Sequence, residues 1–360
     1  MTTHSRLHTT AGALIIAGTM ISAGVITPAA AETPAEFYKG KTVTLLVGSS
    51  PGGGYATYAG VLARHMGRFI PGQPNLVAQS LPGAGSLKAT KLLYARSKKD
   101  GTVMAAVFMG AIVEPMLGEQ GKEFDATKFS YVGSLNRETS MCVSWHTSPV
   151  KTFADLFDKN KKLVVGASGW TSSIRQYPTV LKNILGANFE VISGYDGSTG
   201  ARLAMERGET NGICGLQWSS FATSHRDWID DKKVNVLVQL APTPHPEMTK
   251  LGIPMIWDFV KKQEDKDALM LMFAQLDFGR PYIMPPGVPA DRLQAMRKAF
   301  LDMAKDPAFL DEAKRAKIGV DPVSGEEVTK TVADLYKTSP ALALRVKNAL
   351  GKQPKKKKKK

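Results

Sequence analysis

Cysteine is scarce in this chain, and the sequence shows no metal-binding pattern. Among 360 residues there are two cysteines, Cys142 and Cys214, which form no CxxC motif, and the six histidines are dispersed. Protein zinc sites need clustered thiolates and imidazoles, so no metal is expected. An even cysteine count permits one disulfide in an oxidising compartment. The sequence leaves open whether Cys142 and Cys214 form that bond or remain two buried thiols.

Long apolar runs are missing after residue 31. The stretch 11–26 is apolar but shorter than the roughly 20 residues of a bilayer-spanning helix. It leads to Ala29-Ala30-Ala31, an A-x-A pattern typical of signal-peptide cleavage, and no lipid-accepting cysteine lies nearby. We predict a signal peptide over residues 1–31, cleaved between Ala31 and Glu32, with a membrane anchor as the alternative. The mature chain is then expected in the periplasm.

Positive charge dominates the formal balance but is not gathered on one element. The net charge is +15, and residues 355–360 are all lysine. Without that run and Arg6, 40 basic residues face 32 acidic ones. A nucleic-acid protein concentrates its basic residues, so no nucleic-acid partner is expected, whereas a mild positive field attracts small anions. The Lys-rich tail 352–360 is expected to be disordered.

Short apolar runs alternate with helical patterns along the chain. The expected strands are 42–47, 75–79, 103–108, 162–166, 189–193, 211–214 and 234–240. The expected helices are 58–69, 87–96, 174–185, 200–207 and 290–304, with others beginning at Asp306 and covering 326–338. This alternation predicts an α/β fold with mostly parallel sheets flanked by helices. In such folds ligands bind beyond the carboxyl ends of strands.

Two proline-glycine turns lie at such strand ends. The candidate ligand-binding residues there are Ser49, Ser50, Gly52, Gly53, Gly54 and Tyr55 in the first turn, and Gly83, Ala84, Gly85 and Ser86 in the second. A glycine turn before a helix leaves backbone N–H groups free for an anion. The second turn lacks the third glycine of a dinucleotide fingerprint, and the first lacks the Gly-Lys-Ser/Thr of a Walker loop. We therefore expect no cofactor.

The first turn also fits the G-x-S-x-G pattern of a serine hydrolase, with Ser50 as the nucleophile. Two observations oppose this interpretation. The oxyanion hole of such an elbow uses the backbone N–H of the residue after the serine, and Pro51 has none. Ser50 also comes too early in the mature chain for several strands to precede it. A secreted hydrolase is kept as a remote alternative, and we expect no catalytic residue.

Two further polar loops follow strands in the second half of the chain. The candidate ligand-binding residues are Ser168, Trp170, Ser172 and Ser173 in one loop, and Tyr195, Asp196, Gly197 and Ser198 in the other. Their hydroxyls can cap the following helices or donate hydrogen bonds to a ligand. Four such loops from two halves of a chain can close on one ligand.

Together these loops make the sequence similar to the extracytoplasmic solute receptors of tripartite tricarboxylate transporters, the Bug family of periplasmic binding proteins. The stretches that carry the resemblance are 51–55, 79–86, 99–102, 166–168, 195–197, 205–209, 280–282 and 285–289. Each motif is weak alone, whereas their order and spacing over residues 38–335 are specific. The resemblance implies a type II-like clamshell with a cleft between two domains, namely 35–138 with 278–351 and 139–277.

The resemblance also implies a function without catalysis. A receptor of this family captures a small organic carboxylate, here a di- or tricarboxylate or an aromatic carboxylate, at the loops named above. It delivers the ligand, as a monomer, to the membrane subunits of the transporter. A sensor of the same fold, which presents its closed form to a signalling kinase, is the alternative.

Two positions depart from the family pattern. Most relatives have an aspartate where this chain has Ala56, and relatives of this type often have a proline at Asp196. If Asp196 faced the cleft, it would repel a second ligand carboxylate or attract an amine. Three arginines are candidates for pairing with a distal carboxylate, namely Arg137, Arg175 and Arg202, and Trp170 and Trp218 are candidates for stacking on a flat ligand.

Overall fold

Helices and strands alternate along the computed structural model, which describes residues 1–4, 32–118 and 123–351. The strands are β1 Thr42–Val47, β2 Asn75–Ser80, β3 Val103–Ala106, β4 Ser130–Ser134, β5 Ser140–Trp145, β6 Leu163–Ala167, β7 Phe189–Ser193, β8 Gly212–Gln217, β9 Val234–Leu240, β10 Pro281–Met284 and β11 Val323–Ser324. The predicted cleavage site and the Lys-rich tail lie outside the described residues.

The helices range from single turns to three or four turns. They are α1 Pro34–Tyr38, α2 Gly54–Met66, α3 Leu87–Arg96, α4 Met109–Leu117, α5 Ser173–Leu185, α6 Gly197–Glu206, α7 Trp218–Ser224, α8 Arg226–Asp230, α9 Pro246–Lys250, α10 Gln263–Phe273, α11 Ala290–Met303, α12 Pro307–Arg315, α13 Gly325–Leu335 and α14 Pro340–Leu350. Short 3-10 turns include η1 Gly67–Phe69, η3 Ala126–Lys128, η4 Ala154–Phe157, η5 Ile256–Phe259 and η6 Ala274–Phe278. No described helix is both long and apolar enough to cross a membrane.

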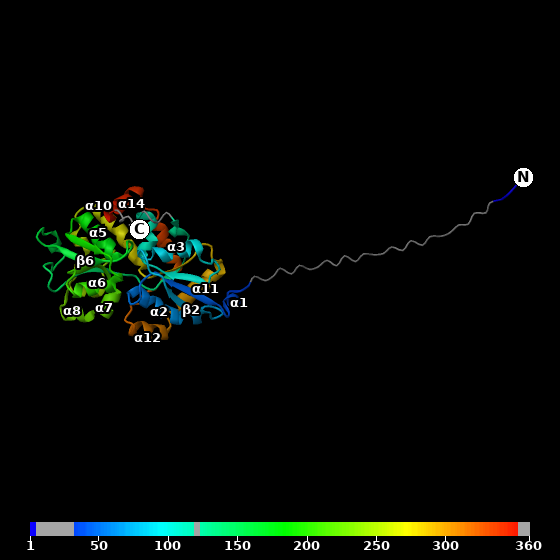
Figure 1. Ribbon diagram of the computed structural model, residues 1–360, viewed down its shortest axis with the longest axis horizontal. Coiled ribbons are helices and arrows are strands. Elements are labelled where there is room, and N and C mark those ends of the chain that lie inside the picture. The colour runs from blue at the N-terminus through cyan, green and yellow to red at the C-terminus, as the bar shows by residue number, and fades with distance from the viewer. Residues whose placement is uncertain (5–31, 119–122, 352–360) are drawn as a thin grey trace, which may run out of the picture. The chain divides into compact units, whose positions relative to one another are not determined.

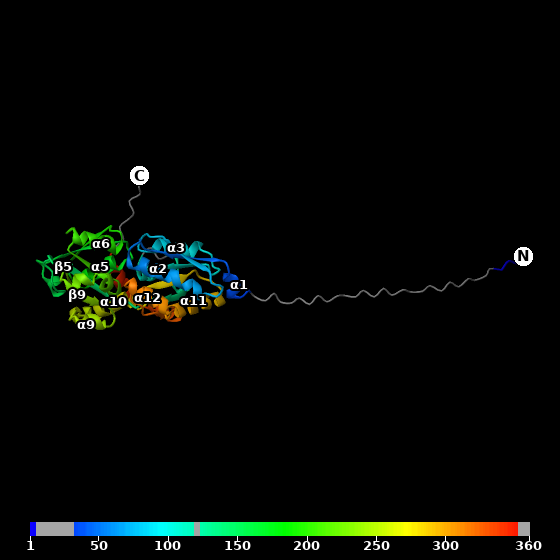
Figure 2. The same cartoon turned by 90° about the horizontal axis from the view of Figure 1, so that it is seen from below.

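Two sheets form two lobes that lie side by side (Figures 1 and 2). Lobe 1 contains a six-stranded sheet in the order β11-β4-β10-β3-β1-β2, and lobe 2 a five-stranded sheet in the order β7-β6-β8-β5-β9. Figure 1 shows α5 to α8 in lobe 2 and α1 to α3 with α11 in lobe 1. Strand β1 is an example of why the sequence folds this way. Its run of valine and leucine is almost wholly buried, as expected for a strand whose sheet is covered on both faces.

The expectation of mostly parallel sheets is only partly right, because both sheets are mixed. Strand β1 runs parallel to β2 and β3, and β6 runs parallel to β7 and β8. The pairs β10–β3, β10–β4, β11–β4, β5–β8 and β5–β9 are antiparallel. The chain passes directly from β4 to β5 and from η6 to β10.

The C-terminal helix α14 extends across both lobes. It packs against α4 of lobe 1 and against α5 and α10 of lobe 2. Figure 1 draws α14 in red beside α10. The side-chain amide of Asn183 on α5 donates to the carbonyl of Ala349 at 2.7 Å, and Arg345 pairs with Asp265 on α10. The predicted domain boundary assigned this helix to lobe 1 alone. Its contacts reach elements of both lobes.

The two cysteines form a disulfide within lobe 2. Cys142 on β5 lies opposite Cys214 on β8 in an antiparallel pair, and their sulfur atoms are 2.00 Å apart. Both side chains are fully buried. The structure therefore answers the question that the sequence left open.

Candidate functional site

Four helices begin at one cavity between the lobes. This inner cavity has a volume of about 80 Å³. Its lining is Gly54, Tyr55, Phe108, Met109, Gly110, Ser168, Thr171, Ser172, Ser173, Ile174, Gln176, Gly197, Ser198, Arg202, Gly215, Leu216, Gln217, Ser220, Phe221, Gln275 and Arg280. The first residues of α2 and α4 come from lobe 1, and those of α5 and α6 come from lobe 2. A ligand in this cavity would therefore touch both lobes.

These four helix starts carry no side-chain caps among the described residues. Their N-cap residues are Gly53, Phe108, Ser172 and Asp196, and none of these side chains accepts a hydrogen bond from its helix. Uncapped helix N-termini present N–H groups and the positive end of the helix dipole. The cavity is therefore suited to an anion.

The charges in the wall agree with this polarity. In the described part of the chain, no aspartate or glutamate lines the inner cavity, whereas Arg202 and Arg280 do. Burial lowers the pKa of Arg202, and Glu206 opposes this effect, but an arginine remains cationic near neutral pH.

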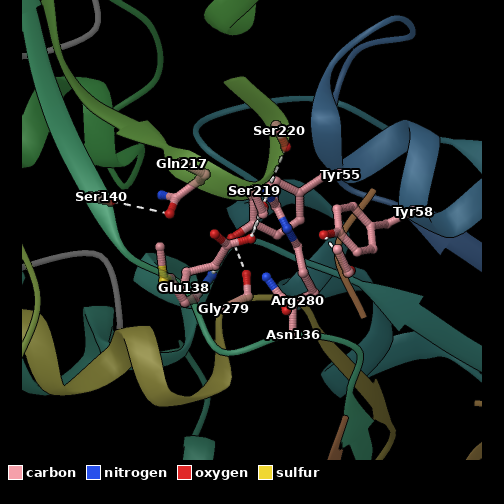
Figure 3. Close-up of polar contacts among 12 residues, drawn as sticks. Tyr55, Tyr58, Asn136, Glu138, Ser140, Gln217, Ser219, Ser220, Gly279 and Arg280 are labelled. Atoms are coloured by element: carbon pink, nitrogen blue, oxygen red, sulfur yellow. Dashed lines mark hydrogen bonds and ion pairs between the residues drawn. The ribbon is translucent and has the colours of Figure 1, made fainter. Parts of the chain in front are cut away.

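Arg280 is buried at the junction of the lobes (Figure 3). Its guanidinium lies over the rings of Tyr55 and Tyr58 at 4.4 and 4.6 Å. The same group pairs with Oε1 of Glu138 at 2.9 Å and donates to the hydroxyl of Ser220 at 2.9 Å. Burial alone would lower the pKa of Arg280, but Glu138 and the tyrosines raise it. Arg280 therefore joins α2, α7 and the segment before β5.

Tyr55 links the first turn to this junction. Its hydroxyl donates to the carbonyl of Gly279 at 2.7 Å, and its ring lies 4.6 Å from that of Phe108. Burial raises the pKa of Tyr55 to about 12, as it does for Tyr58. Both rings therefore remain neutral near physiological pH. Tyr55 forms one wall of the inner cavity while its hydroxyl is held by the backbone.

A second, larger cavity adjoins the first. This outer cavity has a volume of about 450 Å³ and shares six lining residues with the inner one, namely Gly54, Tyr55, Phe108, Ser168, Gly197 and Ser198. The other predicted site residues in its wall are Ser49, Ser50, Gly53, Gly83, Ala84, Gly85, Tyr195 and Asp196. Ser172 and Ser173 line only the inner cavity. The four predicted loops thus meet around one pair of cavities.

Three predicted site residues line neither cavity. Gly52 is exposed, and its carbonyl accepts a hydrogen bond from Thr199 at 3.3 Å. Ser86 is buried, and its hydroxyl donates to the carbonyl of Gly48 at 2.9 Å. Trp170 is also buried and packs under the guanidinium of Arg175, 4.0 Å from its ring. These three residues support the loops.

The second turn contacts lobe 2 directly. The hydroxyl of Thr171 donates to the carbonyl of Gly85, and Thr171 is buried. A Cβ atom on Gly85 would lie 2.2 Å from Oγ1 of Thr171, and one on Gly169 would lie 2.4 Å from the nitrogen of Gly85. The hydroxyl of Ser50 also donates to Asp196 across the lobes. We call the contact between Gly85, Gly169 and Thr171 the seam.

The two positions that depart from the family pattern have different surroundings. Asp196 lines the outer cavity, where it accepts the hydrogen bond from Ser50. Ala56 lines neither cavity and packs against the apolar core of lobe 1. No histidine of the described residues lines either cavity.

The three candidate arginines also have different surroundings. Arg137 is paired with Asp321 at 3.3 Å and Glu327 at 2.6 Å on the surface. Arg175 stacks on Trp170. Of the three arginines, only Arg202 lines the inner or the outer cavity. Trp218 is buried, and its indole N–H donates to Glu247 at 3.3 Å. It does not line the inner or outer cavity.

Several residues of the cavity walls were not predicted from the sequence. The start of α4, at Phe108, Met109 and Gly110, lies beyond the carboxyl end of β3, which is the position that marked the two glycine turns. The same argument could have found it. Others depend on how the lobes meet and left no local signal, namely Thr171, Leu216, Phe221 and Gln275.

The fold was compared with known proteins. No protein-family model and no curated protein sequence matches the chain. Among solved structures, the periplasmic binding protein BugD has a TM-score of 0.69 at 20% identity, covering 88% of this chain and 100% of its own. MatC from Rhodopseudomonas palustris with bound malate has a TM-score of 0.65 at 16% identity, covering 86% and 99%. An R. palustris protein with adipate has a TM-score of 0.66 at 15% identity, covering 86% and 97%.

The similarity extends over nearly the whole length of these structures. A TctC solute-binding protein from Polaromonas, without ligand, also matches at a TM-score of 0.58 and 17% identity, covering 85% of this chain and 98% of its own. The order of the elements and the mixed sheets of two lobes are thus those of a known group of proteins. This chain has the two-lobed α/β fold of the Bug and TctC periplasmic solute-binding proteins.

Proposed function

We propose that this protein is a periplasmic solute receptor of the Bug and TctC family that captures a small organic carboxylate. The observation that carries the proposal is the inner cavity, where four uncapped helices begin and no acidic side chain of the described residues lines the wall. Of the stretches that resemble the Bug family, 51–55, 79–86, 166–168, 195–197 and 280–282 contribute residues to this cavity or to the outer one. The matching structures with malate and adipate support the same class of ligand.

The backbone can supply the required affinity. A hydrogen bond to a charged group contributes roughly 1.5–3 kcal/mol, and a helix N-terminus adds about 0.3–1 kcal/mol. Micromolar binding needs about 8 kcal/mol. A few N–H bonds to one carboxylate, with apolar contact to Tyr55, Phe108 and Phe221, reach that value.

Binding then favours the closed arrangement of the lobes. A ligand that touches α2 and α4 on one side and α5 and α6 on the other gains its full contacts only when both lobes surround it. We propose that the closed form, a monomer, delivers its solute to the membrane subunits of a tripartite transporter. In this role the protein binds and releases its ligand without chemistry.

Calorimetric titration with a panel of carboxylates tests the proposal. The panel includes malate, succinate, adipate, citrate and benzoate, each paired with its neutral amide as a matched control. We expect at least one carboxylate to bind at micromolar concentration or tighter and its amide to bind far more weakly. Failure of every carboxylate to bind, or equal binding of acid and amide, would count against the proposal.

Delivery to a transporter needs a separate experiment. The receptor, loaded with the carboxylate found in the panel, is added to vesicles that contain the membrane subunits of a tripartite tricarboxylate transporter. Uptake should require both the receptor and the subunits. Uptake that is independent of the receptor would refute the transport role while leaving ligand binding intact.

A further inference from the structure

Arg202 places a positive charge near the start of a helix. It lies in the second turn of α6, and its guanidinium folds back toward the first turn. There it donates to the hydroxyls of Ser198 at 3.4 Å and Thr199 at 3.2 Å. The N-terminus of a helix is the positive end of its dipole, so a cation in this position is unfavourable.

No carboxylate in the described part of the chain forms an ion pair with Arg202. Its hydrogen-bond partners there are the two hydroxyls, and Glu206 on the same helix influences it only through the electrostatic field. Arg207, at the other end of α6, pairs with Glu209 at 2.7 Å. On this helix, Arg207 therefore has a carboxylate partner, whereas the partners of Arg202 among the described residues are hydroxyls.

Arg202 is also the uncompensated cation of the inner cavity wall. Arg280 lines the same cavity, but its charge is taken by Glu138 at 2.9 Å. Arg202 is half-buried, so water compensates its charge only in part. Ser198, to which it donates, lines both the inner and the outer cavity. The guanidinium therefore lies where the two cavities meet.

We propose that Arg202 binds a second anionic group of the ligand, so that the receptor selects solutes with two carboxylates over monocarboxylates, whether aliphatic or aromatic. This inference rests on the proposed function, in which helix N-termini hold the first carboxylate. The planar guanidinium can form two parallel hydrogen bonds with a carboxylate at about 2.7–2.9 Å. Such bonds would replace the longer ones to Ser198 and Thr199.

The test compares acids of equal carbon number on the full-length mature protein. Malonate, succinate, glutarate and adipate are titrated beside propionate, butyrate, valerate and hexanoate. We expect the best dicarboxylate to bind at least about tenfold more tightly than its monocarboxylate, because a charge-assisted bond corresponds to roughly 10- to 100-fold in affinity. In the variant Arg202→Gln, the ratio of the affinity for the dicarboxylate to that for the monocarboxylate should fall toward one.

Arg207→Gln is the matched control, since it makes the same change on the same helix outside the cavities. It should keep the preference of the wild type. Thermal unfolding without ligand adds a readout that a structural role would not give. Removing an uncompensated cation from a helix start should leave the melting temperature of Arg202→Gln unchanged or raise it.

Each other outcome overturns the inference. Equal affinity of the wild type for mono- and dicarboxylates would do so, as would an unchanged preference in Arg202→Gln. If the variant Arg202→Gln had a lower melting temperature and lost affinity equally for mono- and dicarboxylates, Arg202 would have a structural role instead. Absence of binding by every acid is the distinct failure of the proposed function itself.

Discussion

The seam between the lobes predicts that Gly85 controls closure. In Gly85→Ala, the new Cβ atom would lie 2.2 Å from Oγ1 of Thr171 and 2.9 Å from its backbone nitrogen. These distances are far below ordinary contact, and backbone cannot move aside as a flexible side chain can. The clash exists only when lobe 2 meets the second turn. The substitution should therefore disfavour the closed state and weaken ligand binding.

The free-energy cost of Gly85→Ala has two parts. Gly85 has φ +68°, where a residue with a side chain costs roughly 1–2 kcal/mol. This cost is present whether the lobes are open or closed. Overpacking costs about 1–3 kcal/mol more and acts on closure alone. Affinity for the best carboxylate should thus fall by roughly 5- to 150-fold, since 1.4 kcal/mol is a factor of ten.

Calorimetry with that carboxylate and thermal unfolding of the free protein measure the two parts. Gly40→Ala is the matched control, because Gly40 has φ +71° and a Cβ atom there would meet nothing within 4 Å. It should lose stability as Gly85→Ala does but keep its affinity. Adding Thr171→Ala to Gly85→Ala should restore part of the lost affinity. If Gly85→Ala binds as tightly as Gly40→Ala, the lobes do not meet at this seam in the bound state.

Three further predictions concern stability. Glu138→Gln leaves the charge of Arg280 buried without its counter-ion and should lower the unfolding free energy by about 3 kcal/mol or more; a change below about 1 kcal/mol in urea denaturation would contradict this. Replacing Cys142 and Cys214 by alanine opens a link between residues 72 apart and should cost up to about 4 kcal/mol, and a reducing agent should destabilise the wild type but not the variant. Burial and Arg202 lower the pKa of His225 to about 4, so the unfolded chain binds the proton more readily and stability should fall as the pH drops from 7 to 4. His225→Phe should flatten that dependence, and an unchanged slope would show that other groups cause it.

Local patterns predicted the repeating units of the fold well. The expected strand 42–47 and helix 87–96 match β1 and α3, because each has the apolar spacing of its own structure. Two strands that were missed, β4 and β10, lie at the crossings between the lobes. Strand β4 contains glycine and serine, and β10 begins with Pro281. Their strand conformation comes from pairing in the sheet, which the local sequence does not encode.

The site could be predicted only in part for the same reason. The four loops were found because glycine and hydroxyl residues follow strands, and most of their residues line a cavity. Thr171 was missed although its neighbours were named. Its function at the seam arises from the approach of Gly85, which is 86 residues away. Contacts between lobes of this kind are set by tertiary structure, and a single sequence gives no pattern for them.

Helix α14 affects how far the two lobes can rotate relative to each other. The chain crosses from lobe 1 to lobe 2 between β4 and β5, and it crosses back between η6 and β10. After α13, which packs on β4 of lobe 1, helix α14 packs on α5 and α10 of lobe 2. The lobes are therefore tied at three places, which restricts their relative rotation more than two connections would. A protein with fewer open arrangements loses less conformational entropy when it closes on a ligand. We therefore expect the C-terminal helix to favour ligand binding, although its residues line neither the inner nor the outer cavity.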